Sequence, residues 1–127
     1  MTRDARQPPD LPVPEPPYSP VVIAGDLVWT AGQVGVDAEG AVVPGGIAAQ
    51  TRQAIANVAA CLAAAGCGLD DVVKTTVFLA DLADFGPYNE EYRRHFAPPY
   101  PARSTVGVAL PAGLLVEIEA VARRPAT

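Results

Sequence analysis

Two stretches near the C-terminal end constrain the fold more than any other part of the chain. Residues 101–108 read Pro-Ala-Arg-Ser-Thr-Val-Gly-Val, and residues 115–121 read Leu-Val-Glu-Ile-Glu-Ala-Val. Both are short and rich in β-branched residues, and a Pro-Ala-Gly break at 111–113 separates them. This pattern predicts two β-strands with a turn between them.

Alternation along these strands predicts a sheet with one apolar face and one charged face. Successive side chains of a strand point to opposite faces. The apolar face, which we expect helices to cover, receives Ser104, Val106, Val108, Val116, Ile118 and Ala120. The other face receives Arg103, Thr105, Leu115, Glu117 and Glu119.

The charged face has two interpretations, and alternation leaves both open. Half-solvated sheets are common, so the charges can simply face water. Alternatively, Arg103 and Glu117 line a pocket for a small anion. An arginine suits that role because its planar fork of donors matches a carboxylate in bidentate fashion.

The same residues resemble a known family signature. Pro-Ala-Arg-Ser-Thr-Val at 101–106 and Val-Glu-Ile-Glu-Ala-Val at 116–121 are similar, in order and spacing, to the C-terminal signature of the RidA (YjgF) family. Members of this family are imine and enamine deaminases that act on reactive intermediates. The resemblance also includes Val-Lys-Thr-Thr-Val-Phe-Leu at 73–79 and covers most of the chain beyond its N-terminal arm.

Composition favours a single domain and excludes several classes of protein. The chain has 127 residues, half of them hydrophobic, which suits one compact domain. The net charge of −5 argues against a nucleic-acid surface, which needs clustered Lys and Arg. We expect a cytoplasmic protein without a membrane span, because no apolar run is long enough to cross a bilayer and no secretory signal is evident. A single histidine and two cysteines without zinc spacing predict no metal site.

The first 17 residues are dominated by proline. They hold six of the 14 prolines. Proline fixes φ and removes a donor, so we expect residues 1–17 to form an extended or disordered arm rather than a folded element. The domain itself would comprise residues 18–127. In the family a Pro-Tyr-Ser segment opens the domain, and its tyrosine reaches the active-site cleft. Tyr18 occupies this position, and the alternative is that it only packs the arm onto the body.

The middle of the chain predicts strands and helices in alternation. The predicted elements are a hairpin at 21–31, a helix at 47–65 with an apolar stripe, a two-sided apolar strand at 72–79 and a helix at about 85–96. Gly32 lies where family backbone lines the ligand pocket, or is simply a turn glycine. Asn89 lies where the family has an asparagine near the cleft, or faces water. We assign no chemistry to His95, which is typical of a surface residue or a partner of the helix dipole.

The element order predicts an α+β fold with one sheet and two helices on one of its faces. Adjacency alone would pair the strand at 103–108 with the strand at 115–121. The resemblance implies instead the family's chorismate-mutase-like fold, a single mixed sheet in which strand 72–79 lies between those two. It also implies a homotrimer with active sites between subunits.

The resemblance implies hydrolysis of 2-imino and 2-enamino acids to 2-keto acids and ammonia, without a metal or cofactor. Arg103 would bind the substrate carboxylate. Glu117 would position the attacking water and act as a general base, and Thr105 would contact the ligand. Glu119, on the same strand face, is the candidate for a structural ion-pair partner.

Three departures from the family pattern bear on the substrate. Gly107 replaces a common glutamate, Ala31 replaces a common serine, and the arginine that usually precedes the residue at Leu110 is missing. A changed rim changes what fits, so a specialised branch acting on another pathway intermediate is an alternative. Two others are a non-catalytic trimer that binds small carboxylates or regulates a partner enzyme, and a ribonuclease, which the acidic charge disfavours.

Overall fold

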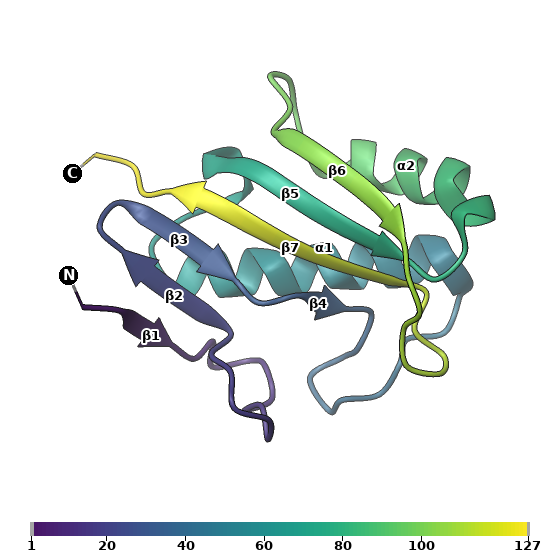
Figure 1. Ribbon diagram of the computed structural model, residues 1–127, viewed down its shortest axis with the longest axis horizontal. Coiled ribbons are helices and arrows are strands. Elements are labelled where there is room, and N and C mark those ends of the chain that lie inside the picture. The colour runs from purple at the N-terminus through teal and green to yellow at the C-terminus, as the bar shows by residue number, and fades with distance from the viewer. Residues whose placement is uncertain (1, 127) are drawn as a thin grey trace.

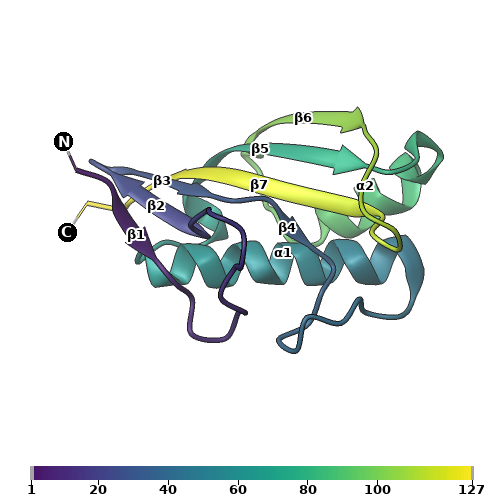
Figure 2. The same cartoon turned by 60° about the horizontal axis from the view of Figure 1, so that its bottom comes forward.

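The structure, a computed structural model, describes residues 2–126, which form one mixed β-sheet with two α-helices on one of its faces (Figures 1 and 2). The strand order is β1-β2-β3-β7-β5-β6, and the short β4 also pairs with β7. The strands are β1 (Asp4–Arg6), β2 (Val21–Ala24), β3 (Leu27–Thr30), β4 (Gln33–Val34), β5 (Val72–Leu79), β6 (Ala102–Gly107) and β7 (Val116–Arg123). The helices are α1 (Gly46–Ala64) and α2 (Phe85–Arg93), with short 3-10 turns at Leu69–Asp71 and Leu82–Asp84.

Strand β5 lies between β7 and β6, as the family resemblance implies. It runs antiparallel to β7, pairing Val77 with Ile118, and parallel to β6, pairing Thr75 with Arg103. A parallel pair needs a crossover connection, and the segment containing α2 supplies it. The prediction that strand 72–79 separates the two C-terminal strands is therefore confirmed.

The core lies between the sheet and α1. Ile55, Val58 and Leu62 of α1 are buried at helical spacing, which confirms the predicted apolar stripe. Val77 and Ile118 of the sheet are fully buried as well. Burial of each such side chain stabilises the fold by about 1.5–3 kcal/mol, so this packing fixes which face of β5 and β7 turns toward the helices.

Helix α2 is attached to the sheet through aromatic side chains. Tyr88 and Tyr92 are buried, and the ring of Tyr92 stacks on that of Phe96 with 4.5 Å between centroids. The hydroxyl groups of Tyr92 and Thr75 share a hydrogen bond of 2.8 Å. This bond joins α2 directly to the central strand β5.

A buried carboxylate joins α2 to α1. Glu91 is only 3% exposed, and it accepts hydrogen bonds from Arg52 of α1 at 3.1 Å and from His95 at 2.7 Å. Burial raises the pKa of Glu91, but the bonds from His95 and Arg52 outweigh burial, and the pKa is lowered overall. His95 is thus engaged in holding the helix, and the Glu91 carboxylate stays ionised.

The proline-rich arm contains a strand that its composition did not predict. Asp4–Arg6 pairs with β2 as an edge strand, although residues 1–17 were expected to lack folded elements. The prolines begin only at Pro8, so the residues before it keep the N–H donors that a strand needs. Farther along, Leu11 packs against the core, and the Nε2 atom of Gln7 donates to its carbonyl at 3.0 Å. A separate domain at 18–127 stays a prediction.

The face assignment of the first signature strand is wrong. On β7, Val116, Ile118 and Ala120 turn toward the helices and Glu117 and Glu119 lie on the open face, as predicted. On β6, however, Arg103 sits beside the buried Thr75 and points toward the helices, as does Thr105. Ser104 and Val106 therefore lie on the open face. β6 is an edge strand, and polar and aromatic side chains of α2 cover it. The positions of its apolar residues therefore do not indicate which of its faces turns toward the helices.

The remaining boundaries agree with the sequence to within a few residues. Helix α2 ends at Arg93 rather than near residue 96, and β7 continues to Arg123. None of the helices formed by residues 2–126 is both long and apolar enough to cross a membrane.

Candidate active site

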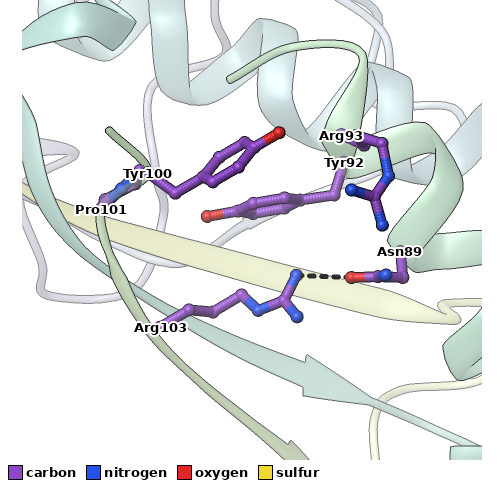
Figure 3. Close-up of a pocket in the computed structure, with 6 residues that line it drawn as sticks. All are labelled: Asn89, Tyr92, Arg93, Tyr100, Pro101 and Arg103. Atoms are coloured by element: carbon purple, nitrogen blue, oxygen red, sulfur yellow. Dashed lines mark hydrogen bonds between the residues drawn. The ribbon is translucent and has the colours of Figure 1, made fainter. Parts of the chain in front are cut away.

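Arg103 projects from the edge strand β6 over helix α2. Its Nη1 atom donates a hydrogen bond of 2.8 Å to Oδ1 of Asn89, which Figure 3 shows as a dashed line. Its guanidinium carbon lies 4.7 Å from the ring centroid of Tyr92 and 5.5 Å from that of Tyr88. Cation–π contacts of this kind contribute about 0.5–2 kcal/mol. They position the guanidinium while leaving most of its five N–H donors for a ligand.

The two aromatic rings are themselves held by hydroxyl groups of the sheet. The hydroxyl of Tyr92 bonds to Thr75, and that of Tyr88 lies 3.3 Å from Oγ1 of Thr105. Burial raises the pKa of both tyrosines, so both remain neutral phenols at physiological pH. Thr105 therefore positions the Tyr88 ring, which lies beneath Arg103.

Arg103, Asn89 and Tyr92 border a pocket of about 380 Å³ (Figure 3). Its lining consists of Asn89, Tyr92, Arg93, Tyr100, Pro101 and Arg103. No acidic residue lines it, and none of the ion pairs within residues 2–126 includes Arg103. A fixed arginine without a counter-ion, beside a pocket of this size, indicates a site for a small anion.

Glu117 lies on β7, where it neighbours Phe78 of β5 and Val34 of β4. Burial raises the pKa of its carboxyl group, and the negative charge of Glu119 raises it further. A carboxylate whose pKa moves toward neutrality is better matched to proton transfer at physiological pH. Glu117 thus has the electrostatic setting of a general base.

Gly32 leaves the space that Glu117 occupies. A Cβ atom at position 32 would lie 2.7 Å from Cδ of Glu117, closer than real side chains pack. Gly32 also borders a second pocket of about 220 Å³, whose lining includes Tyr18 and the arm residues Leu11 and Pro14. Tyr18 is 54% exposed, so its ring is accessible to solvent.

The two predicted catalytic residues do not meet within one chain. Arg103 lies on the helix side of the sheet, together with Asn89 and Thr105. Glu117 lies on the open face, with Gly32 beside it. The prediction that Arg103 and Glu117 share a face is therefore wrong. Strand β5 lies between β6 and β7, and its pairing with each of them preserves the alternation of side chains between the two faces of the sheet. A change of rotamer therefore cannot bring the two groups together.

Several residues in and around the pocket were not predicted from the sequence. Phe85, Tyr88 and Tyr92 recur at helical spacing along α2, and Phe96 follows just beyond its end; this series was the available signal for an aromatic surface under Arg103. The sequence did not indicate that Tyr100 and Arg93 line a pocket. Tyr100 lies in a proline-rich connection, and Arg93 has the pattern of an exposed helix residue. Within residues 2–126, no cluster of three or more His, Cys, Asp or Glu side chains is placed to hold a metal ion.

Comparisons with known sequences agree on one family. The model of the family described as Endoribonuclease L-PSP matches residues 9–124. A Mus musculus protein named 2-iminobutanoate/2-iminopropanoate deaminase is 48% identical over 108 residues, which cover 84% of this chain and 80% of that protein. The Homo sapiens protein of the same name is 46% identical over 108 residues, covering 84% of this chain and 79% of that protein.

Solved structures show the same fold over nearly the whole chain. RidA from an Antarctic Psychrobacter is 41% identical with a TM-score of 0.89, covering 95% of this chain and 99% of that one. E. coli TdcF, determined with bound serine, is 38% identical with a TM-score of 0.88, covering 96% and 99%.

Fold and site together define an α+β protein with a pocket lined by Arg103 at the edge of its sheet. The chain belongs to the Endoribonuclease L-PSP family, that is, to the RidA (YjgF) proteins whose signature it carries. The resemblance inferred from residues 101–106 and 116–121 is confirmed.

Replacing Gly32 by alanine tests the close packing against Glu117. We expect the added Cβ to displace the Glu117 carboxyl group, because the end of that side chain can rotate away. The free energy of unfolding should fall by only about 1 kcal/mol, the low end for an overpacked site. A crystal structure and a urea denaturation curve measure the two effects. Gly68→Ala is the control, since nothing lies within 4 Å of its added Cβ. A Glu117 carboxyl that stays in place would contradict the prediction.

Proposed function

We propose that this chain hydrolyses 2-imino and 2-enamino acids to 2-keto acids and ammonia. The observation that carries the proposal is the pocket at Arg103, where a positioned guanidinium has no carboxylate partner within residues 2–126. The names of the mammalian relatives support an imine deaminase, and the serine bound to E. coli TdcF supports an amino-acid-like ligand. Each such substrate carries a carboxylate next to its reacting carbon.

In this proposal Arg103 binds the substrate carboxylate. Two parallel N–H donors of the guanidinium meet the two carboxylate oxygens, which fixes both the position and the orientation of the adjacent C2 atom. Asn89 restrains one edge of the guanidinium, and the ring of Tyr92 supports its face. Thr105 acts through Tyr88, whose hydroxyl it contacts.

Beyond binding of the carboxylate, the reaction requires little more than one positioned water molecule. A protonated imine is already electrophilic at C2, so the water oxygen attacks that carbon while the C=N electron pair moves to nitrogen. Glu117 accepts a proton from the water and then returns it to the amine nitrogen. The C–N bond breaks as the hydroxyl becomes a carbonyl, and the hydroxyl proton leaves with ammonia as ammonium.

The proposed site lies between copies of the chain in a homotrimer. Arg103 and Glu117 occupy opposite faces of one sheet, so a substrate that contacts both must lie between two copies. The open face also exposes Trp29 and Val106, at 48% and 42%, which a neighbouring copy would cover. Tyr18 and Gly32 would complete the site on the Glu117 side.

The description of the matching family raises RNA cleavage as a second candidate function. RNA binding depends on a continuous basic track, whereas this chain has a net charge of −5. Its single histidine is bound to the buried Glu91. An RNA degradation assay run beside the imine assay distinguishes the two, and the proposal expects activity only with the imine.

Substitution of the two proposed catalytic residues tests the reaction. Arg103→Ala should lower kcat/KM for 2-iminobutanoate by about 100-fold or more, because the substrate loses its orienting contact. Glu117→Gln should lower kcat by about 100-fold while binding of 2-oxobutanoate persists, because only the base is lost. The assay follows how strongly the protein suppresses semicarbazone formation from imine produced in situ. Unchanged turnover of Arg103→Ala would discard its role, and lost binding in Glu117→Gln would make Glu117 structural.

The pH profile tests the role of Glu117 separately. Only its ionised form accepts a proton, so kcat/KM should fall as pH falls through the pKa of Glu117. Because the charge of Glu119 helps to raise that pKa, Glu119→Gln should lower it and shift the acid limb of the profile to lower pH. Glu39→Gln, in an exposed turn, is the control. An acid limb that stays in place or moves to higher pH would assign it to another group.

A further inference from the structure

The pocket at Arg103 holds a second arginine that the proposed reaction does not use. Arg93, at the end of α2, lines the same pocket of about 380 Å³. Figure 3 shows its guanidinium pointing from the helix into the space beside Asn89 and Arg103. A substrate such as 2-iminobutanoate has one carboxylate, which Arg103 accounts for. The second cation therefore has no counterpart on that substrate.

Arg93 has only a weak ionic partner in its own chain. Its Nε atom lies 4.0 Å from Oε1 of Glu90, and the two side chains are 57% and 70% exposed. Exposed pairs of this kind contribute little to stability, so this contact does not hold the guanidinium back from a ligand. Arg94, the next residue, instead turns toward the buried Glu91, with 3.4 Å between Nη1 and Oε1. The two neighbouring arginines thus lie on different sides of α2: Arg93 lines the pocket, and Arg94 contacts Glu91.

Two cations around a pocket to which its own chain contributes no acidic residue favour a ligand with two negative charges. Each guanidinium can hold one carboxylate in bidentate fashion. An alkyl side chain on the substrate would leave Arg93 unpaired, whereas a carboxylate at the end of that side chain would pair with it. The volume of the pocket lies in the range of about 300–1,000 Å³ typical of ligand sites, which leaves room beyond a three-carbon imino acid.

We propose that Arg93 determines substrate specificity and that the pocket takes 2-imino dicarboxylates, the imines of acidic amino acids. Arg103 holds the carboxylate next to the imine carbon, and Arg93 holds the carboxylate of the side chain. This inference rests on the proposed function, and it names the substrate class of the same site.

Arg93→Gln tests this role, with Arg94→Gln as the matched control that removes the same charge one position along the helix. The substrates are 2-iminoglutarate and 2-iminobutanoate, each produced in situ by an amino-acid oxidase and followed by semicarbazone trapping. In Arg93→Gln, the ratio of kcat/KM for the dicarboxylate to kcat/KM for the monocarboxylate should fall about tenfold, mainly through KM, since a hydrogen-bonded charge is lost. Arg94→Gln should keep the wild-type ratio.

A binding measurement separates this inference from the proposed reaction. Calorimetry with the stable products should show 2-oxoglutarate binding to the wild type more tightly than 2-oxobutanoate, and Arg93→Gln should remove that preference. If neither imine is hydrolysed but this binding pattern holds, the proposed function fails and the role of Arg93 stands. If imines are hydrolysed but Arg93→Gln weakens both ligands equally, or Arg94→Gln gives the same change, the role of Arg93 is refuted and the proposed function stands.

Discussion

The register of the central strand β5 with its two neighbours determines what the rest of the molecule can do. The parallel pairing with β6 places Arg103 beside the buried Thr75, and the antiparallel pairing with β7 places Glu117 beside Phe78. Neighbouring residues of β5 alternate between faces, so the cation and the carboxylate are held on opposite sides of one sheet. A one-residue slip would bury charged side chains in the core, which makes this register costly to change.

Separation by the sheet preserves the chemistry of both groups. If Arg103 and Glu117 met within one chain, they would form an ion pair, the arginine would be occupied, and the pKa of the glutamate would fall. Instead, Arg103 rests on Tyr92 and Asn89, neither of which neutralises its charge. Burial and Glu119 keep the pKa of Glu117 raised. Within one chain the two groups therefore stay apart, and in the proposed homotrimer a second copy would supply the missing one.

The hydrophobic pattern of the sequence predicted the helices and strands that pack against the core. It failed for the edge strand β6, whose apolar side chains do not pack there. The helix at 47–65 has an apolar stripe, and strand 72–79 buries Val77 and Leu79, because both elements pack against the core, and the structure confirms both. The edge strand β6 packs against aromatic and polar side chains, so its Val106 faces outward and the predicted face of Arg103 was wrong. The pocket residue Arg93 is separated in sequence from the signature strands, and only folding brings it to Arg103.

Mixing two inactive variants tests the central claim most directly. Arg103→Ala and Glu117→Gln proteins are unfolded together and refolded in equal amounts, so that trimers form at random from both chains. If each site takes Arg103 from one copy and Glu117 from another, about a quarter of the sites are intact, and imine hydrolysis should return to about a quarter of the wild-type rate. If mixed protein stays as inactive as either variant alone while wild-type protein recovers after the same treatment, the two residues do not act across copies, and the account is contradicted.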